Sequence, residues 1–223
     1  FTYFYKQFAF TLAGLAGMFA VSKIDYRRYQ TQWVVYAFVA VTVIFLVAVF
    51  AFPAINGARR WIRFAGLSFQ PSEMAKLALP LFLAYFLTKN EKTVGDLKAT
   101  VIPCVAVMCL LAGLVFLEPD LGTVIVLCAI FSAVYFAAGA KLLHIATVAA
   151  VMVVGALAAV LLAPWRVQRL MAFLDPFSHS DDAGYQVVQS LMTLGSGGIF
   201  GEGFAKGQGK LFYLPYPYSD FIF

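Results

Sequence analysis

Residues 121–140 read Leu121-Gly-Thr-Val-Ile-Val-Leu-Cys-Ala-Ile-Phe-Ser-Ala-Val-Tyr-Phe-Ala-Ala-Gly-Ala140 and carry no charged side chain. Lys141 ends this run, and residues 142–163 form a second run without lysine, arginine, aspartate or glutamate. A helix needs about 20 apolar residues to cross the hydrocarbon core of a bilayer. Two runs of this length, separated by a single lysine, predict two membrane-spanning helices joined by a short turn.

Further apolar segments precede this pair, so the sequence predicts a bundle of membrane-spanning helices in residues 1–163. The predicted spans are 4–22, 33–54, 72–88, 99–117, 121–140 and 142–163. Residues 164–219 are predicted to form a large loop, and residues 220–223 to begin another span. The fold class is therefore an all-α polytopic membrane protein. We expect an internal fragment of a longer protein, because the chain opens without a signal peptide and stops inside an apolar run.

The composition excludes an ordinary soluble domain. Hydrophobic residues make up 62% of the chain and charged residues 12%, and the mean hydropathy is +0.85. The net charge of +5 is spread over loops, which argues against a nucleic-acid partner. Cys104, Cys109 and Cys128 lie inside apolar runs and lack the spacing of metal ligands.

The charges of the short loops predict the orientation in the membrane, because cytoplasmic loops carry an excess of lysine and arginine. The cations that follow the first, third and fifth predicted spans are Lys23, Arg27, Arg28, Lys89, Lys92, Lys98 and Lys141. We expect these loops in the cytoplasm, which places the large loop on the extracytoplasmic side. Arg59, Arg60 and Arg63 then lie outside, against the rule, and an anionic ligand would explain them.

Two of the residues in that arginine loop have side chains suited to a phosphorylated lipid. Arg60 offers planar, paired donors for phosphate oxygens, and Trp61 can pack against a lipid or a sugar face. The loop leads into Pro71 and Ser72, which are favourable residues at the start of a helix.

Three charged residues lie near the predicted ends of apolar helices. Glu73 and Lys76 are spaced i, i+3 in the third span, so they share a face and can pair. Such a pair faces a cavity or a partner, or it is a structural ion pair that fixes helix packing. Asp120 precedes the fifth span, where it caps the helix, faces the same cavity, or does both.

The end of the chain, Leu211–Phe223, contains one carboxylate, Asp220, between a proline-stiffened aromatic segment and a Phe-Ile-Phe run. Aromatic residues suit a membrane–water interface. A carboxyl group that is partly desolvated there has a raised pKa, which favours general-base chemistry. The alternative is an interfacial loop in which Asp220 only caps the next helix.

Several motifs, in this order, resemble the SEDS family, which contains the bacterial cell-wall polymerases FtsW, of division, and RodA, of elongation. They are Gly57-Ala-Arg-Arg-Trp-Ile, Phe69-Gln-Pro-Ser-Glu-Met-Ala-Lys, Pro119-Asp-Leu-Gly-Thr, Gly184-Tyr-Gln, Gly195-Ser-Gly-Gly and Ser219-Asp-Phe-Ile-Phe. The resemblance covers nearly the whole chain. It implies a SEDS-type bundle of ten helices, six of which lie in this chain, with the large loop extracytoplasmic.

The resemblance also implies an activity and a set of site residues. It implies a peptidoglycan glycosyltransferase that polymerises lipid II, with Asp220 as the catalytic general base. The substrate-binding residues that it implies are Arg60, Trp61, Glu73, Lys76 and Asp120. Two departures from the family pattern stand near the base, since Tyr216 replaces a frequent glutamate and Phe212 replaces a glutamate of many division-type members.

The sequence also leads to expectations about a cofactor, about partners and about competing functions. A divalent cation, Mg or Mn, is expected on the pyrophosphate of the substrate. The expected partners are a class B penicillin-binding protein and other division or elongation proteins, at the bacterial inner membrane. The motifs favour an FtsW-type enzyme over a RodA-type enzyme. A lipid II flippase and a scaffold for division proteins are the alternatives from other functional classes.

Overall fold

A computed structural model of the chain describes residues 2–54, 57–64, 67–180 and 184–203. The chain divides into two compact units, residues 1–152 and 153–223, and each is described by itself below. The helices and strands of the first unit are α1 (Thr2–Ser22), η1 (Tyr26–Gln30), α2 (Gln32–Ala48), η2 (Val49–Ala51), β1 (Ile62–Phe64), β2 (Leu67–Phe69), α3 (Pro71–Lys89), η3 (Glu91–Thr93), η4 (Leu97–Val101), α4 (Ile102–Leu117), α5 (Leu121–Ala137) and the first part of α6 (Leu142–Leu161).

The helices begin where local chemistry favours a helix start. Pro71 occupies the first turn of α3, where its missing N–H is not needed. The side chain of Asp96 accepts hydrogen bonds from the backbone N–H groups of Lys98 (2.9 Å) and Ala99 (3.1 Å) and so caps the turn that leads into α4. Asp120 caps α5 in the same way.

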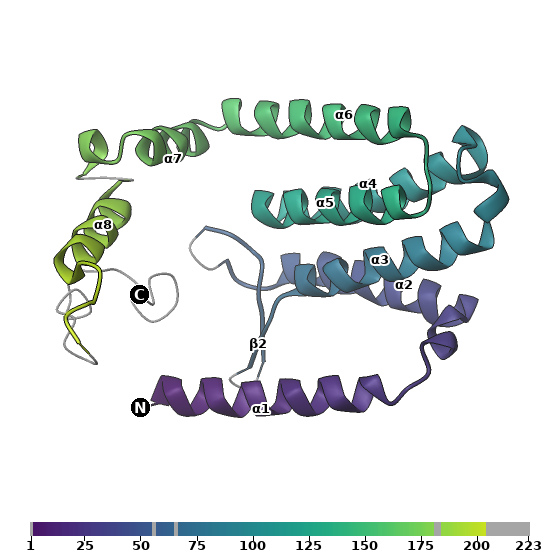
Figure 1. Ribbon diagram of the computed structural model, residues 1–223, viewed down its shortest axis with the longest axis horizontal. Coiled ribbons are helices and arrows are strands. Elements are labelled where there is room, and N and C mark those ends of the chain that lie inside the picture. The colour runs from purple at the N-terminus through teal and green to yellow at the C-terminus, as the bar shows by residue number, and fades with distance from the viewer. Residues whose placement is uncertain (1, 55–56, 65–66, 181–183, 204–223) are drawn as a thin grey trace. The chain divides into compact units, whose positions relative to one another are not determined.

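The core of the first unit lies among α2, α3, α4 and α5, which run alongside one another (Figure 1). Leu79 and Leu83 of α3, Leu111 of α4 and Phe131 of α5 are at most 1% exposed. Tyr135 of α5 is also fully buried, and its hydroxyl donates a hydrogen bond to the backbone carbonyl of Val94 (3.0 Å). The packing therefore fixes the ends of α3, α4 and α5 relative to one another.

The helices agree with an all-α membrane protein. In the part of the chain that the structure describes, four helices are long and apolar enough to cross a membrane: Phe4–Ser22, Gln32–Ala51, Leu97–Leu117 and Leu142–Leu161. Helices α3 and α5 occupy two further predicted spans, but α3 carries three charged residues and α5 has 17 residues. The bounds of the six predicted spans in the membrane stay predictions.

A short β-hairpin interrupts the helical fold before α3, and the sequence analysis did not predict it. Strands β1 and β2 pair antiparallel, with Ile62 opposite Phe69 and Phe64 opposite Leu67. The ring of Phe69 packs edge-on against the ring of Phe45 in α2, with centroids 5.6 Å apart. This contact holds the hairpin against α2.

The second unit contains the end of α6 and helices α7 (Pro164–Leu174), η5 (Phe177–His179) and α8 (Tyr185–Gly197). Arg166 donates a hydrogen bond to the carbonyl of Ala159 (2.7 Å), which holds the start of α7 against the end of α6. Its guanidinium also stacks over the ring of Trp165. The large loop of the sequence analysis is therefore partly helical in its described residues.

Candidate functional site

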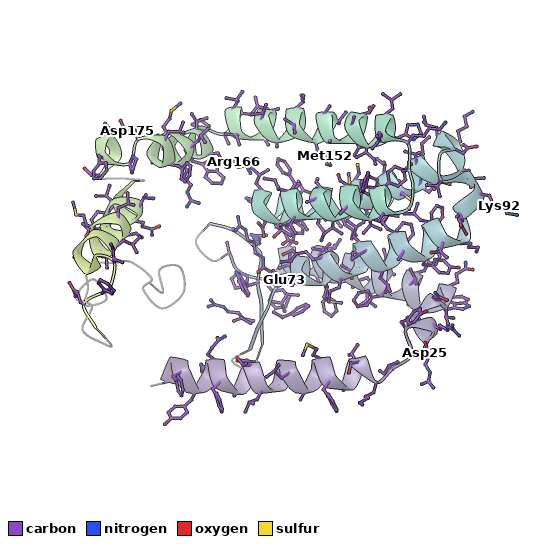
Figure 2. All side chains as sticks on the ribbon, viewed as in Figure 1. Asp25, Glu73, Lys92, Met152, Arg166 and Asp175 are labelled. Carbon is purple, nitrogen blue, oxygen red and sulfur yellow. The ribbon has the colours of Figure 1, made fainter. Side chains whose placement is uncertain are left out.

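The five predicted substrate-binding residues come from three places in the first unit. Arg60 and Trp61 lie in the segment before β1, Glu73 and Lys76 lie in the first two turns of α3, and Asp120 lies between α4 and α5. The sixth predicted residue, Asp220, lies outside the described residues. Figure 2 shows Glu73 at one end of α3, and Asp25 and Lys92 in the loops at the opposite end.

Arg60 joins the loop before β1 to the turn between α4 and α5. Its Nε donates a hydrogen bond to the backbone carbonyl of Glu118 (2.9 Å), and its Nη2 donates one to the carbonyl of Pro119. Arginine has five N–H donors, so the two bonds leave part of the guanidinium for a ligand. The structure thus gives Arg60 a structural role that the sequence analysis did not anticipate.

Asp120 is held from two elements. Its Oδ1 accepts a hydrogen bond from the backbone N–H of Thr123 (3.2 Å), and its Oδ2 accepts one from the Thr123 hydroxyl (2.9 Å). The side-chain amide of Gln70, at the start of α3, donates a third (3.2 Å). Asp120 therefore caps α5 and also links α5 to α3, which confirms the capping interpretation. A role in substrate binding stays a prediction.

Glu73 and Lys76 form the ion pair that their spacing predicts. The ammonium of Lys76 lies 2.6 Å from the carboxylate of Glu73. The side chain of Glu73 is 57% exposed and that of Lys76 is 28% exposed. An ion pair of this exposure contributes about 0–1 kcal/mol in water, which is far less than a buried pair. The pair therefore contributes little to stability by itself, and contact of Glu73 and Lys76 with a substrate stays a prediction.

This leads to a test of the pair in the full-length protein. If the two groups act only as a pair, the Lys76→Ala variant leaves Glu73 unpaired, and it should unfold at a lower temperature than the double variant Glu73→Gln, Lys76→Met. The expected difference in the free energy of unfolding between the two variants is about 1 kcal/mol or less. Thermal unfolding and glycan synthesis are both measured. A double variant that is the less active of the two would contradict the ion-pair interpretation and indicate that each group acts on the substrate.

Trp61 and Arg59 complete the loop before β1. Trp61 is 38% exposed, so part of its ring is available to a ligand. Arg59 donates a hydrogen bond to the carbonyl of Phe50 (2.8 Å), which holds the loop against the end of η2. The exposed indole and the two anchored arginines agree with a binding surface, and a role of Trp61 in substrate binding stays a prediction.

Glu118 is the residue of this site that the sequence analysis missed. It follows α4 directly and is 0% exposed. The pKa of its carboxyl group is raised to about 8, mainly by burial and also by the nearby charge of Asp120, while the charge of Arg60 lowers it. The sequence contained a signal, because the residue prolongs the apolar run 99–117 and stands directly before a proline.

The described residues bring no three histidine, cysteine, aspartate or glutamate side chains together in an arrangement that holds a metal. The expectation of Mg or Mn concerned the pyrophosphate of the substrate and stays a prediction.

The fold and the site together define a class of protein. It is a polytopic helical bundle with ionisable side chains at the start of α3 and α5. The whole chain, residues 1–223, matches the family of FtsW, RodA and SpoVE, described as a cell cycle protein. The chain belongs to this family.

Individual relatives agree with the family assignment. The chain is 36% identical over 221 residues to the probable peptidoglycan glycosyltransferase FtsW of Geobacter sp. (strain M18), with 97% of this chain and 59% of that protein covered. It is 33% identical over 222 residues to the stage V sporulation protein E of Bacillus subtilis, with 98% of this chain and 60% of that protein covered. The chain therefore spans about three fifths of the length of these curated relatives.

Solved structures support the same fold. One is a chain of a peptidoglycan synthase complex that coordinates polymerization and crosslinking, with a TM-score of 0.66 and 29% identity over 89% of this chain and 58% of that one. Another is the rod shape determining protein RodA of Thermus thermophilus, with a TM-score of 0.52 and 30% identity over 67% of this chain and 46% of that one. The fold class predicted from the sequence is thereby confirmed.

Proposed function

We propose that the protein to which this chain belongs is a peptidoglycan glycosyltransferase that polymerises lipid II into glycan strands during cell division. The observation that carries the proposal is the match of nearly the whole chain to peptidoglycan glycosyltransferases of the FtsW type. The arrangement of Arg60, Asp120 and the Glu73–Lys76 pair supports the proposal, because these residues offer positively and negatively charged groups to a polar, phosphorylated substrate.

The chemistry assigns roles to three of the predicted residues. Asp220 takes the proton from the 4-hydroxyl of one lipid II sugar while that oxygen attacks the anomeric carbon of the other chain. The bond from this carbon to the lipid pyrophosphate breaks in the same step. Lys76 and the free donors of Arg60 offset the negative charge that grows on the departing pyrophosphate. An α-linked donor and a β-linked product require a single displacement, which needs one base and no covalent intermediate.

The distribution of charge favours this enzyme over a lipid II flippase. A flippase requires polar groups along a path through the membrane. Helices α2, α4 and α5 carry no aspartate, glutamate, lysine or arginine, and α3 carries none between Lys76 and Lys89. The charged side chains of these four helices thus stand near helix ends, as an enzyme that works at one membrane surface requires.

The test of the proposed function is glycan synthesis by the purified full-length protein. The protein is supplied with lipid II in detergent or in vesicles, and the length of the glycan products is measured on gels. Products of many disaccharide units are expected. Transport of lipid II across vesicle membranes without any glycan product would overturn the proposal in favour of the flippase.

The proposed partner is a class B penicillin-binding protein, the transpeptidase that crosslinks the new strands. The similarity to a chain of a peptidoglycan synthase complex supports this proposal. A partner that works on strands outside the cell also requires the site on the outer side of the inner membrane.

We further propose that the loops after α1 and α3 are cytoplasmic and that the large loop is extracytoplasmic. Single cysteines at Arg27 and Lys92, in a background without the native cysteines, should resist a membrane-impermeant thiol reagent in intact cells. A cysteine at Ser180 should react. Permeabilised cells, in which all three sites should react, serve as the control. Labelling of the first two sites with protection of the third would invert the orientation and place Asp220 in the cytoplasm.

A further inference from the structure

Glu118 is a fully buried acid without a hydrogen-bond donor. Its side chain is 0% exposed, and in the described part of the chain neither carboxylate oxygen has a hydrogen-bond partner. A buried ionised carboxylate without a partner is costly, and such a group is expected to stay protonated instead. The proposed function gives no task to this residue.

The guanidinium nearest to Glu118 binds the backbone of the same turn. Arg60 donates to the carbonyl oxygens of Glu118 and Pro119, and no bond to the Glu118 carboxylate is present. Those two bonds tie the turn between α4 and α5 to the loop before β1. The turn also contains Asp120, which is the anionic cap of α5.

The other charged groups of the elements packed around this turn are engaged, exposed or absent. Arg59 donates to the carbonyl of Phe50, and Arg63 on β1 is exposed. Glu73 and Lys76 of α3 bind each other, and Asp120 is held by Gln70 and Thr123. Helices α2, α4 and α5 contribute no charged side chain. Asp120 and Arg60 are therefore the charges that act on Glu118. Burial, with a smaller contribution from Asp120, outweighs the opposing charge of Arg60 and raises the pKa of Glu118 to about 8.

We propose that Glu118 is a positioning residue that works as a neutral carboxylic acid. Because a neutral Glu118 does not attract the guanidinium of Arg60, that guanidinium stays bound to the two backbone carbonyls. Asp120 is then the anionic side chain of the turn. Ionised Glu118 would draw the guanidinium from the carbonyls and repel the carboxylate of Asp120. The turn would then loosen, and with it the start of α5 and its link to α3 through Gln70. This inference rests on the proposed function and adds a residue to its site.

The main experiment compares the pH dependence of lipid II polymerisation by full-length wild type and Glu118→Gln. Glutamine has nearly the same size and cannot ionise. At pH 6.5 the variant should work within about threefold of wild type. At pH 9 the polymerisation rate of wild type should be about tenfold lower than that of the variant. The reason is that only about one tenth of a group with a pKa of 8 is still protonated at pH 9.

A matched control is Glu91→Gln, a change of the same kind at an exposed residue of η3. Its pH profile should follow wild type. Two results would overturn the inference: a Glu118→Gln profile with the same alkaline loss as wild type, or a loss above 100-fold at pH 6.5, which would make the carboxyl group a participant in the reaction.

Thermal unfolding tests the inference without the enzyme assay. Because the pKa of Glu118 is raised, its contribution to stability is complete below pH 4.5, declines as the pH rises towards 8, and then stays constant. The unfolding temperature of Glu118→Gln should therefore rise relative to wild type between pH 5 and pH 8, by about 4 °C or more. A difference that does not change with pH would overturn the inference. Protein that shows this shift but makes no glycan would contradict the proposed function alone.

Discussion

The Asp220→Asn variant of the full-length protein should polymerise lipid II about 10²–10⁴-fold more slowly than wild type. Asparagine keeps the size of the side chain and most of its hydrogen bonds, but it cannot accept the proton of the attacking hydroxyl. Expression and binding of the transpeptidase should stay near normal. The measurement is the initial rate of glycan synthesis by purified protein at matched concentrations.

Asp175→Asn is the matched control for this prediction. Asp175 accepts hydrogen bonds from the backbone N–H (3.3 Å) and the hydroxyl (2.6 Å) of Ser178, and it is not one of the predicted site residues. Asparagine has nearly the same size and keeps an acceptor oxygen, so this variant should keep its activity. Glycan synthesis near the wild-type rate by Asp220→Asn would contradict the catalytic role and leave Asp220 as a helix cap.

The sequence was sufficient to predict the fold class, an all-α membrane protein. Apolar runs and their limits predict α3 and α5 closely, because Pro71 and Asp120 are residues whose local chemistry starts a helix wherever they stand. The pairing of Glu73 with Lys76 is also local, since the helix itself brings residues three apart together. The helix starts and the ion pair depend only on residues that are close together in the chain, so they can be predicted from the sequence.

The hairpin before α3 was not predicted, although the sequence contains a pattern that is typical of short strands. Ile62-Arg-Phe and Leu67-Ser-Phe alternate apolar and polar side chains, and two residues, the second of them a glycine, separate the two segments in the sequence. Short strands next to a membrane helix are easily overlooked, because their apolar residues extend the apolar run that predicts the helix. The contact of Phe69 with Phe45 was beyond prediction, since it depends on the position of α2.

The partners of Arg60 could not be predicted from the sequence. For Glu118 the sequence contained only a local signal, its place at the end of the apolar run 99–117, and not the contact with Arg60. Arg60 stands 58 residues before Glu118 in the chain, and no local pattern connects them. The two meet because α3, α4 and α5 pack together and bring the turn after α4 under the loop before β1. An ionisable side chain takes its pKa from such packing, so its charge state is a property of the fold and not of the motif.

The structure also changes what the arginine loop is expected to do. The sequence offered an anionic ligand as the reason for arginines on the extracytoplasmic side. Arg59 and Arg60 both bind backbone carbonyls, which is a second reason for their presence. Arg63, on β1, is exposed. The three arginines are therefore separable by mutation, and a variant of Arg60 should differ from a variant of Arg63.

Arg60→Ala should lower both the stability and the activity of the full-length protein, whereas Arg63→Ala should leave stability unchanged. The Arg60 variant loses two hydrogen bonds from a charged donor, each worth about 1.5–3 kcal/mol, and partial exposure favours the lower end, or about 3 kcal/mol in total. Arg60→Lys keeps the charge but not the paired geometry, so it should recover only part of this loss. Thermal unfolding and the kinetics of polymerisation at varied lipid II concentration are measured together. If Arg60→Ala unfolds at the wild-type temperature and shows only a raised KM, Arg60 is a direct ligand of the substrate, and its bonds to the turn contribute nothing to the fold.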